Sequence, residues 1–246
     1  VRENWTEEMS ALTTNNTLIN KEIQKGIYDD FILKAADILG DLSLDEKVME
    51  IAFILNARHG ARLVNEFGCK VSVELHTDLS FDLEGIVNYG KRFHDIAPDN
   101  FIVKVPYTST GLIGARKLGE MGIPVNFTLG FSARQNTLAM WLAQPHFVNV
   151  FLGRLNSFVA DNELGDGKNI GEKTTIASQN IVRKIRPETG KNTQQIAASM
   201  RTEEQVGLLA GIDVFTMPTK VSKPAREKLE QDADAEASAE PSRTFA

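Results

Sequence analysis

The chain has 246 residues, of which 42% are hydrophobic and 24% are charged, and its formal net charge is −6. This length and composition predict one substantial hydrophobic core and a single domain. One cysteine, Cys69, excludes a disulfide framework within the chain, no apolar run reaches the length of a membrane span, and the mild acidity argues against broad binding to nucleic acid or to anionic membranes.

Short apolar runs alternate along the chain with longer amphipathic segments. This alternation is typical of repeated βα units and a parallel sheet. Seven runs predict strands, at residues 11–14, 71–75, 101–105, 125–129, 147–151, 195–199 and 213–217.

The segments between these runs have the spacing of helices. Residues 111–121, 133–142, 169–184 and 202–209 are predicted helices, and the last begins Thr-Glu-Glu-Gln, a capping-box pattern with Gln205 in its fourth position. Residues 28–67 are long enough for two or three helices, and residues 1–9 are predicted to form the first helix. From residue 222 the sequence becomes acidic, rich in small residues and non-periodic, which predicts a frayed helix end followed by a disordered tail over residues 222–246.

Lys104 stands inside the apolar run 101–106, where an ammonium group is costly. Burial can lower a lysine pKa by roughly 3–5 units from about 10.4 and so leave a neutral amine near physiological pH. Such an amine can attack a ketone or aldehyde to form a Schiff base. The alternatives are a lysine that extends from a strand end to water, or a structural ion pair.

Polar side chains recur at every second position near the ends of several predicted strands. Residues two apart on a strand face the same way, and catalytic side chains of closed parallel barrels converge at the carboxyl ends of the strands. One such residue is usually a satisfied core group, but several at one level are harder to explain as packing, because each unpaired group costs about 1–3 kcal/mol. The positions are Ser72, Glu74, Lys104, Asn126, Thr128, Ser199 and Arg201.

These residues belong to motifs whose order and spacing resemble those of the transaldolases, which are Schiff-base enzymes with a (β/α)8 TIM barrel. The motifs are Thr13-Thr-Asn15, Val71-Ser-Val-Glu74, Val103-Lys-Val-Pro106, Gly122-Ile-Pro-Val-Asn-Phe-Thr-Leu129, Phe131-Ser-Ala-Arg-Gln135, Phe151-Leu-Gly-Arg154 and Ala198-Ser-Met-Arg201. Each motif is weak alone, whereas all of them in order are specific. The resemblance implies an α/β fold with a TIM barrel over residues 1–221.

The resemblance also implies roles for individual residues. Lys104 would form the Schiff base, and Glu74 with Thr128 would hold a catalytic water for proton transfer. The residues implied in substrate binding are Thr14, Asn15, Asn126, Phe151, Arg154, Ser199 and Arg201.

The chemistry of these residue types agrees with those roles. A carboxyl in an apolar strand can relay a proton, although Glu74 could instead form a plain salt bridge to Lys104. Arg154 and Arg201 have planar guanidinium groups that can bind a phosphate through paired hydrogen bonds. The alternative for each is a surface ion pair.

Two departures from the family pattern stand out. Asn149 occupies a position where the family often has a serine, which would alter contacts to the sugar chain without removing the lysine chemistry. The family also has an aspartate-bearing first strand upstream of the Thr-Thr-Asn motif, for which the sequence before Thr13 leaves no room. We therefore expect the first strand and its aspartate to be missing from this chain, by truncation, processing or genuine loss.

The resulting hypothesis is a reversible transfer of a dihydroxyacetone unit from a ketose phosphate, sedoheptulose 7-phosphate or fructose 6-phosphate, to an aldose phosphate in the pentose phosphate pathway. The alternatives are an aldolase that releases dihydroxyacetone, and a catalytically impaired sugar-phosphate-binding protein. Sugar phosphates are the expected partners, and neither a cofactor nor a metal is expected. We expect a cytoplasmic location, no binding to nucleic acid or membranes, and leave a homo-oligomer open.

Overall fold

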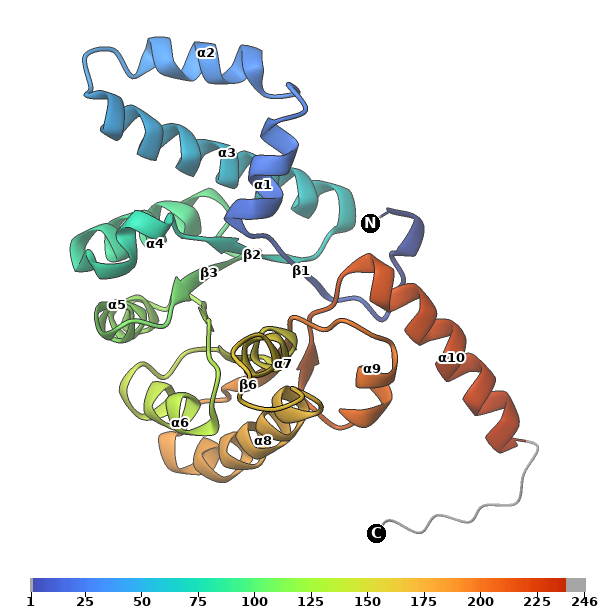
Figure 1. Cartoon of the computed structure of the whole chain (residues 1–246). Helices are drawn as coiled ribbons and strands as arrows, with labels where there is room; N and C mark the ends of the chain where they lie inside the picture. The colour runs from blue at the N-terminus through green and yellow to red at the C-terminus, as the bar shows by residue number, and fades with distance from the viewer. Residues whose placement is uncertain (1, 238–246) are drawn as a thin grey trace.

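The computed structural model describes residues 2–237, with the side chains of residues 2–230. Its centre is a seven-stranded parallel sheet whose strands follow one another in chain order, so that β1 and β7 form the two edges. The sheet curls into a half-barrel with helices around its outside (Figure 1). The strands are β1 (Ala11–Thr13), β2 (Lys70–Glu74), β3 (Phe101–Pro106), β4 (Val125–Thr128), β5 (Phe147–Phe151), β6 (Gln194–Ala198) and β7 (Val214–Phe215).

All seven predicted strands are therefore confirmed. Over residues 2–237, the α/β fold is that of a (β/α)8 barrel from which one strand is missing, as the sequence predicted. The open side lies between β7 and β1, where the first strand of a closed barrel would stand.

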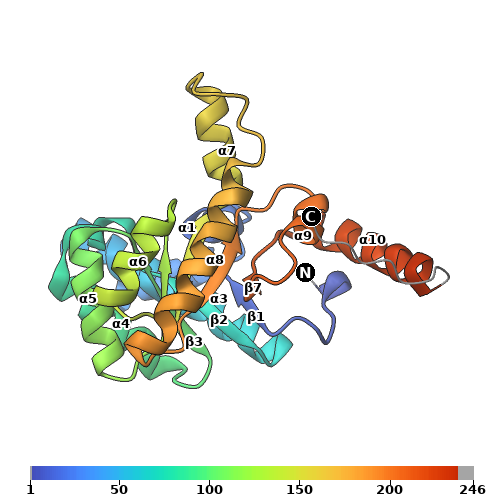
Figure 2. The same ribbon diagram turned by 90° about the horizontal axis from the view of Figure 1, so that it is seen from below.

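The helices follow the predicted alternation, and residues 28–67 contain two of them, α2 and α3. Figure 2 shows that α7 and α10 project away from the body of the molecule. Among the described residues, none of the helices combines the length and apolar character needed to cross a membrane. The helices are α1 (Asn16–Ile23), α2 (Asp29–Ile38), α3 (Leu44–Phe67), α4 (Leu83–Ile96), α5 (Ser109–Glu120), α6 (Ala133–Leu142), α7 (Leu152–Asp161), α8 (Ile170–Thr189), α9 (Glu204–Leu208) and α10 (Thr219–Ala237).

The N-terminal segment differs from its prediction. In place of a first helix over residues 1–9, a short 3-10 turn covers Arg2–Asn4. This segment lies against the end of α3, where Arg2 pairs with Glu66 and the Trp5 ring lies 4.7 Å from that of Phe67. At the other end, the expected helix end is α10, which continues across residue 221 to Ala237, and the predicted tail over residues 238–246 lies outside the described residues.

The main core lies between the outer face of the sheet and the surrounding helices. Val103 and Val105 of β3 are fully buried, as are Ile86 and Leu118 from α4 and α5. Because side chains alternate along a strand, burying these valines under the helices turns Lys104 to the opposite, inner face. Packing on the outside of the sheet therefore positions the polar groups within the half-barrel.

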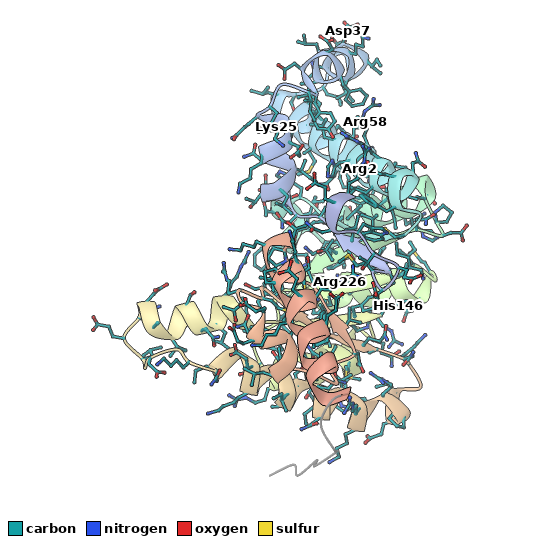
Figure 3. The ribbon with its side chains drawn as sticks, turned by 90° about the vertical axis from the view of Figure 1, so that its right-hand side faces the viewer. Arg2, Lys25, Asp37, Arg58, His146 and Arg226 are labelled. Atoms are coloured by element: carbon teal, nitrogen blue, oxygen red, sulfur yellow. The ribbon has the colours of Figure 1, made fainter. Side chains whose placement is uncertain are left out.

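Helices α1, α2 and α3 form a unit at one end of the molecule, on which Lys25, Asp37 and Arg58 lie (Figure 3). Helix α3 begins with a complete capping box, in which the Ser43 side chain accepts a hydrogen bond from the Glu46 amide and the Glu46 carboxylate accepts one from the Ser43 amide. It ends at Gly68, whose φ of 63° is a left-handed conformation that glycine adopts without strain.

We expect Ser43→Ala to lower the free energy of unfolding by about 1 kcal/mol, because the first turn of α3 loses its side-chain acceptor. Chemical denaturation followed by circular dichroism would measure the change. Ser157→Ala is the matched control, since Ser157 lies exposed within α7, where alanine is the better helix former. Equal losses in both variants would contradict the capping role of Ser43.

Candidate active site

Lys104 lies in the middle of β3, in register with Glu74 of β2 and Asn126 of β4. It is 7% exposed, its Nζ donates to the Thr14 carbonyl oxygen at 3.0 Å, and the same atom lies 3.3 Å from Glu74 Oε1. Burial lowers the pKa of Lys104; the charge of Glu74 and its hydrogen bond act in the opposite direction, and the charge of Arg154 lowers the pKa further. The position of Lys104 thus favours the neutral amine that a nucleophile requires.

The Glu74 carboxylate has a separate partner for each oxygen. Oε1 faces the lysine, and Oε2 accepts a hydrogen bond from the backbone amide of Asn16 at 3.0 Å. The ion pair that the sequence left as an alternative is present. It does not exclude catalysis, because Glu74 lies within reach of the lysine amine and its side chain is 18% exposed, so that water can approach it.

Asn126 belongs to a chain of polar groups that crosses the inner face of the sheet. Its Nδ2 donates to Ser72 Oγ at 3.1 Å, and its Oδ1 accepts from Asn149 Nδ2 at 2.6 Å. Asn149 Nδ2 also contacts the Phe127 carbonyl oxygen at 3.0 Å. Asn149 therefore fixes the orientation of the Asn126 amide.

Thr128 and Thr14 differ in what their side chains bind. Thr128 lies on the same face of β4 as Asn126. Its Oγ1 is buried and has no hydrogen-bond partner among the described residues. Thr14 Oγ1 is already engaged with the Ser72 carbonyl oxygen at 3.1 Å, and its own carbonyl group receives the lysine. Thr128 thus has a hydroxyl free for another ligand, whereas Thr14 contributes mainly through its backbone.

Asn15 is held in a structural role in this conformation. Its Oδ1 caps α1 by accepting a hydrogen bond from the Leu18 amide at 2.8 Å. The predicted substrate contact of Asn15 stays a prediction, and only the side-chain nitrogen is available for it without loss of the cap.

Arg154 stands in the first turn of α7, and Arg201 lies against the same turn at Gly153. Arg154 lies in the first turn of α7 with its guanidinium 5.1 Å from the centre of the Phe151 ring. A Cβ atom built on the neighbouring Gly153 would lie 2.8 Å from Arg201 Nε and 2.1 Å from the Ser199 carbonyl oxygen. Glycine at position 153 therefore lets the loop after β6 lie directly on the first turn of α7. Arg154, Ser199 and Arg201 thereby occupy one region beside a helix N-terminus, which favours anions.

A polar network that the sequence analysis missed supports this loop. Gln205 Oε1 accepts hydrogen bonds from the amides of Arg201 at 2.7 Å and Thr202 at 3.2 Å, while its Nε2 donates to Glu172 at 2.5 Å. Gln205 makes one of the two bonds of the predicted capping box, because its side chain accepts from the Thr202 amide, although α9 begins only at Glu204. The spacing between Thr202 and Gln205 can be recognised in the sequence. The contact of Gln205 with the buried Glu172 cannot, because Glu172 lies 33 residues earlier in the chain.

The region lacks the features of a metal site. Among residues 2–230, no group of three or more histidine, cysteine, aspartate or glutamate side chains is arranged to hold a metal ion. The groups present are a buried amine, a carboxylate beside it, hydroxyl and amide groups, and two exposed guanidiniums. Together they can form a carbonyl adduct, move protons and bind an anion.

A model of the Transaldolase/Fructose-6-phosphate aldolase family matches residues 4–245. The chain is 28% identical over 230 residues to a transaldolase of Xanthomonas euvesicatoria pv. vesicatoria, covering 89% of this chain and 69% of the relative. It is 30% identical over 216 residues to a probable transaldolase of Exiguobacterium sibiricum, covering 87% of this chain and 78% of the relative. Among solved structures, it is similar to the PaMucR phosphodiesterase in complex with c-di-GMP, at a TM-score of 0.45 and 19% identity, over 74% of this chain and 72% of that one.

Proposed function

We propose that this chain, which belongs to the transaldolase/fructose-6-phosphate aldolase family, transfers a dihydroxyacetone unit between sugar phosphates. The transfer would proceed through a Schiff base on Lys104. The donor would be fructose 6-phosphate or sedoheptulose 7-phosphate, and the acceptor an aldose phosphate, as in the pentose phosphate pathway. A cytoplasmic location is part of this proposal.

The observation that carries the proposal is the buried amine of Lys104 beside Glu74. The Lys104 side chain is about nine-tenths buried, and its Nζ lies 3.3 Å from the Glu74 carboxylate. Glu74 can therefore exchange protons with the adducts that Lys104 forms with a carbonyl substrate. Burial lowers the pKa of Lys104 and makes the nucleophilic form more abundant.

In the first stage, the Lys104 amine attacks the ketone carbon of the ketose phosphate, and the adduct loses water to give the Schiff base. A proton then leaves the hydroxyl group on the carbon β to the protonated imine. The bond between the α and β carbons breaks, and the electron pair of that bond passes into the imine. This yields an enamine on Lys104 and a free aldose phosphate. Addition of the enamine to a second aldehyde, followed by hydrolysis, completes the transfer.

Glu74 and Thr128 are proposed to handle the protons in these steps. A water between them would collect the hydroxyl proton and return it in the reverse direction. The Asn126 amide, which contacts Ser72 and Asn149, would bind a substrate hydroxyl.

Release of dihydroxyacetone is the second candidate reaction, because the matching family includes fructose-6-phosphate aldolases. The two reactions differ in whether the enamine carbon takes up a proton or attacks an aldehyde, and hydrolysis of the resulting imine follows in both. Measuring three-carbon transfer from sedoheptulose 7-phosphate and free dihydroxyacetone in one reaction mixture separates them. Binding of sugar phosphate without either product would instead favour the impaired binding protein.

We expect Arg154→Ala and Arg201→Ala each to raise KM for phosphorylated substrates by about 10- to 100-fold, since each removes charge-assisted hydrogen bonds worth about 1.5–3 kcal/mol. KM for an unphosphorylated ketose would change far less. Arg116→Ala on α5 is the control, because the Arg116 side chain pairs with Glu120 at the surface. Equal losses on phosphorylated and unphosphorylated substrates would assign the two arginines a structural role.

A further inference from the structure

Glu172 is a buried side chain whose carboxylate is held by two amide groups. It lies in the first turn of α8 and is 6% exposed. Asn156 Nδ2 lies 3.2 Å from its Oε1 and 3.0 Å from its Oε2, and Gln205 Nε2 donates to Oε1 at 2.5 Å. Within residues 2–230, none of the ion pairs includes Glu172. The two amides therefore take the place of a cation at this buried carboxylate.

The side chains that bind Glu172 are themselves oriented by backbone groups. Asn156 Oδ1 accepts a hydrogen bond from the Gly171 amide at 2.7 Å, at the start of α8. Gln205 Oε1 accepts one from the Arg201 amide at 2.7 Å. Because each side-chain oxygen binds a backbone N–H group, each NH2 group is left for the carboxylate.

These bonds connect the two segments that carry the arginines, where α7, α8 and α9 meet (Figure 1). Asn156 follows Arg154 by two positions on α7. Gln205 binds the backbone of the loop that contains Arg201. Glu172 belongs to neither segment and is bonded to both, so its carboxylate fixes one segment relative to the other.

We propose that Glu172 is a positioning residue that holds Arg154 and Arg201 at the separation that binds a phosphate group. Glu172 does not touch the substrate in this role, because it acts through Asn156 and Gln205. The inference rests on the proposed function, since it takes the two arginines as the phosphate site. It adds Glu172 and Asn156, to which neither the sequence motifs nor the family resemblance gave a role.

Glu172→Gln changes the hydrogen bonds at this position and keeps the size of the side chain. Both oxygens of Glu172 accept from NH2 groups, whereas a glutamine accepts at its oxygen and donates at its nitrogen. The variant therefore places an NH2 group against that of Asn156 or Gln205. It also removes a negative charge, which by itself would strengthen the binding of an anion. Weaker phosphate binding in Glu172→Gln would thus report a lost position, not a lost charge.

We expect Glu172→Gln to raise KM for fructose 6-phosphate by about 10-fold, because hydrogen bonds to a charged group are lost. The value of kcat, and KM for fructose, should change by less than about twofold. Glu50→Gln is the matched control, since the Glu50 carboxylate on α3 is likewise bonded on both oxygens, by Arg92 and Tyr89. The control should leave every kinetic constant unchanged. Equal changes for fructose and fructose 6-phosphate, or an unchanged KM for both, would overturn the inference.

Adding Asn156→Asp to Glu172→Gln should restore the bonds. One oxygen of the introduced aspartate would still accept from the Gly171 amide, and the other would accept from the new glutamine amide. The glutamine oxygen would then face Gln205 Nε2. KM for fructose 6-phosphate should return to within about threefold of its original value. A double variant that folds but keeps the raised KM would contradict the positioning role, even where Glu172→Gln alone is too unstable to assay.

Binding of inorganic phosphate gives a test that does not depend on turnover. Its affinity, measured by calorimetry, should fall about 10-fold in Glu172→Gln. In an Arg201→Ala background the same substitution should weaken binding by less than about twofold, because the loop then has no guanidinium to place. Equal losses in both backgrounds would overturn the inference. Failure to trap Lys104 with a ketose phosphate, with the phosphate results as expected, would overturn only the proposed function.

Discussion

Lys104→Met is expected to reduce turnover by about 10⁴-fold or more, because the group that forms the covalent bond to the substrate is lost. Methionine keeps most of the length and apolar character of the lysine stem, so the packing of β3 should survive. Incubation with fructose 6-phosphate and borohydride should add a three-carbon mass to the peptide that contains Lys104. The variant should show no such mass.

Lys117→Met is the matched control, since Lys117 is exposed on α5. It should keep both the activity and the trapped adduct. Trapping at another lysine, or trapping that survives in Lys104→Met, would contradict the assignment of the nucleophile.

The pH dependence of trapping follows from the environment of Lys104. Attack requires the neutral amine, whose fraction grows as pH rises through the pKa of the folded protein. Since burial lowers the pKa of Lys104 from 10.5, the rate of trapping should rise at a lower pH than for an exposed lysine. The charge of Glu74 opposes this shift, so Glu74→Gln should move the rise to lower pH still.

Local sequence signals were sufficient for the sheet and for the position of Lys104. A run such as 101–105 has β-branched and aromatic residues at the length of a strand, and alternation then assigns the valines to the core and the lysine to the inner face. The pairing of β2 with β3 and of β3 with β4 also follows, because strands of a parallel sheet adjacent in sequence usually pair, whereas their register is seen only in the structure. Glu74, Lys104 and Asn126 therefore come side by side.

The contacts that the sequence did not predict are those between residues distant in the chain. Asn56 belongs to a helix whose neighbours Ile51, Ala52 and Leu55 have the pattern of a core face, and nothing local shows that its amide meets Asn16. The same holds for Glu172 and Gln205, which meet only after α7, α8 and α9 have packed. Local propensity also failed at residues 2–9, because contacts with the end of α3 replace a helix there.

Glu74→Gln and Thr128→Val are each expected to slow carbon–carbon cleavage by about 10²–10⁴-fold while Lys104 can still be trapped slowly. Glutamine keeps an acceptor for the Asn16 amide but cannot exchange a proton with the substrate. Valine keeps the shape of threonine and removes the one buried hydroxyl that has no partner within the described residues. Single-turnover measurements would separate the cleavage step from Schiff-base formation.

The double variant decides whether Glu74 and Thr128 act as one unit. If both hold the same water, losing either disables the proton transfer, and the loss in the double variant should be far smaller than the product of the single losses. Thr108→Val is a control for removing a threonine hydroxyl. Thr108 caps α5 in the loop after β3, so this substitution should lower the stability of the protein rather than the cleavage rate. Losses that multiply cleanly would show that the two side chains work separately. Glu74 would then move protons directly through its 3.3 Å contact with Lys104, and Thr128 would serve another part of the substrate.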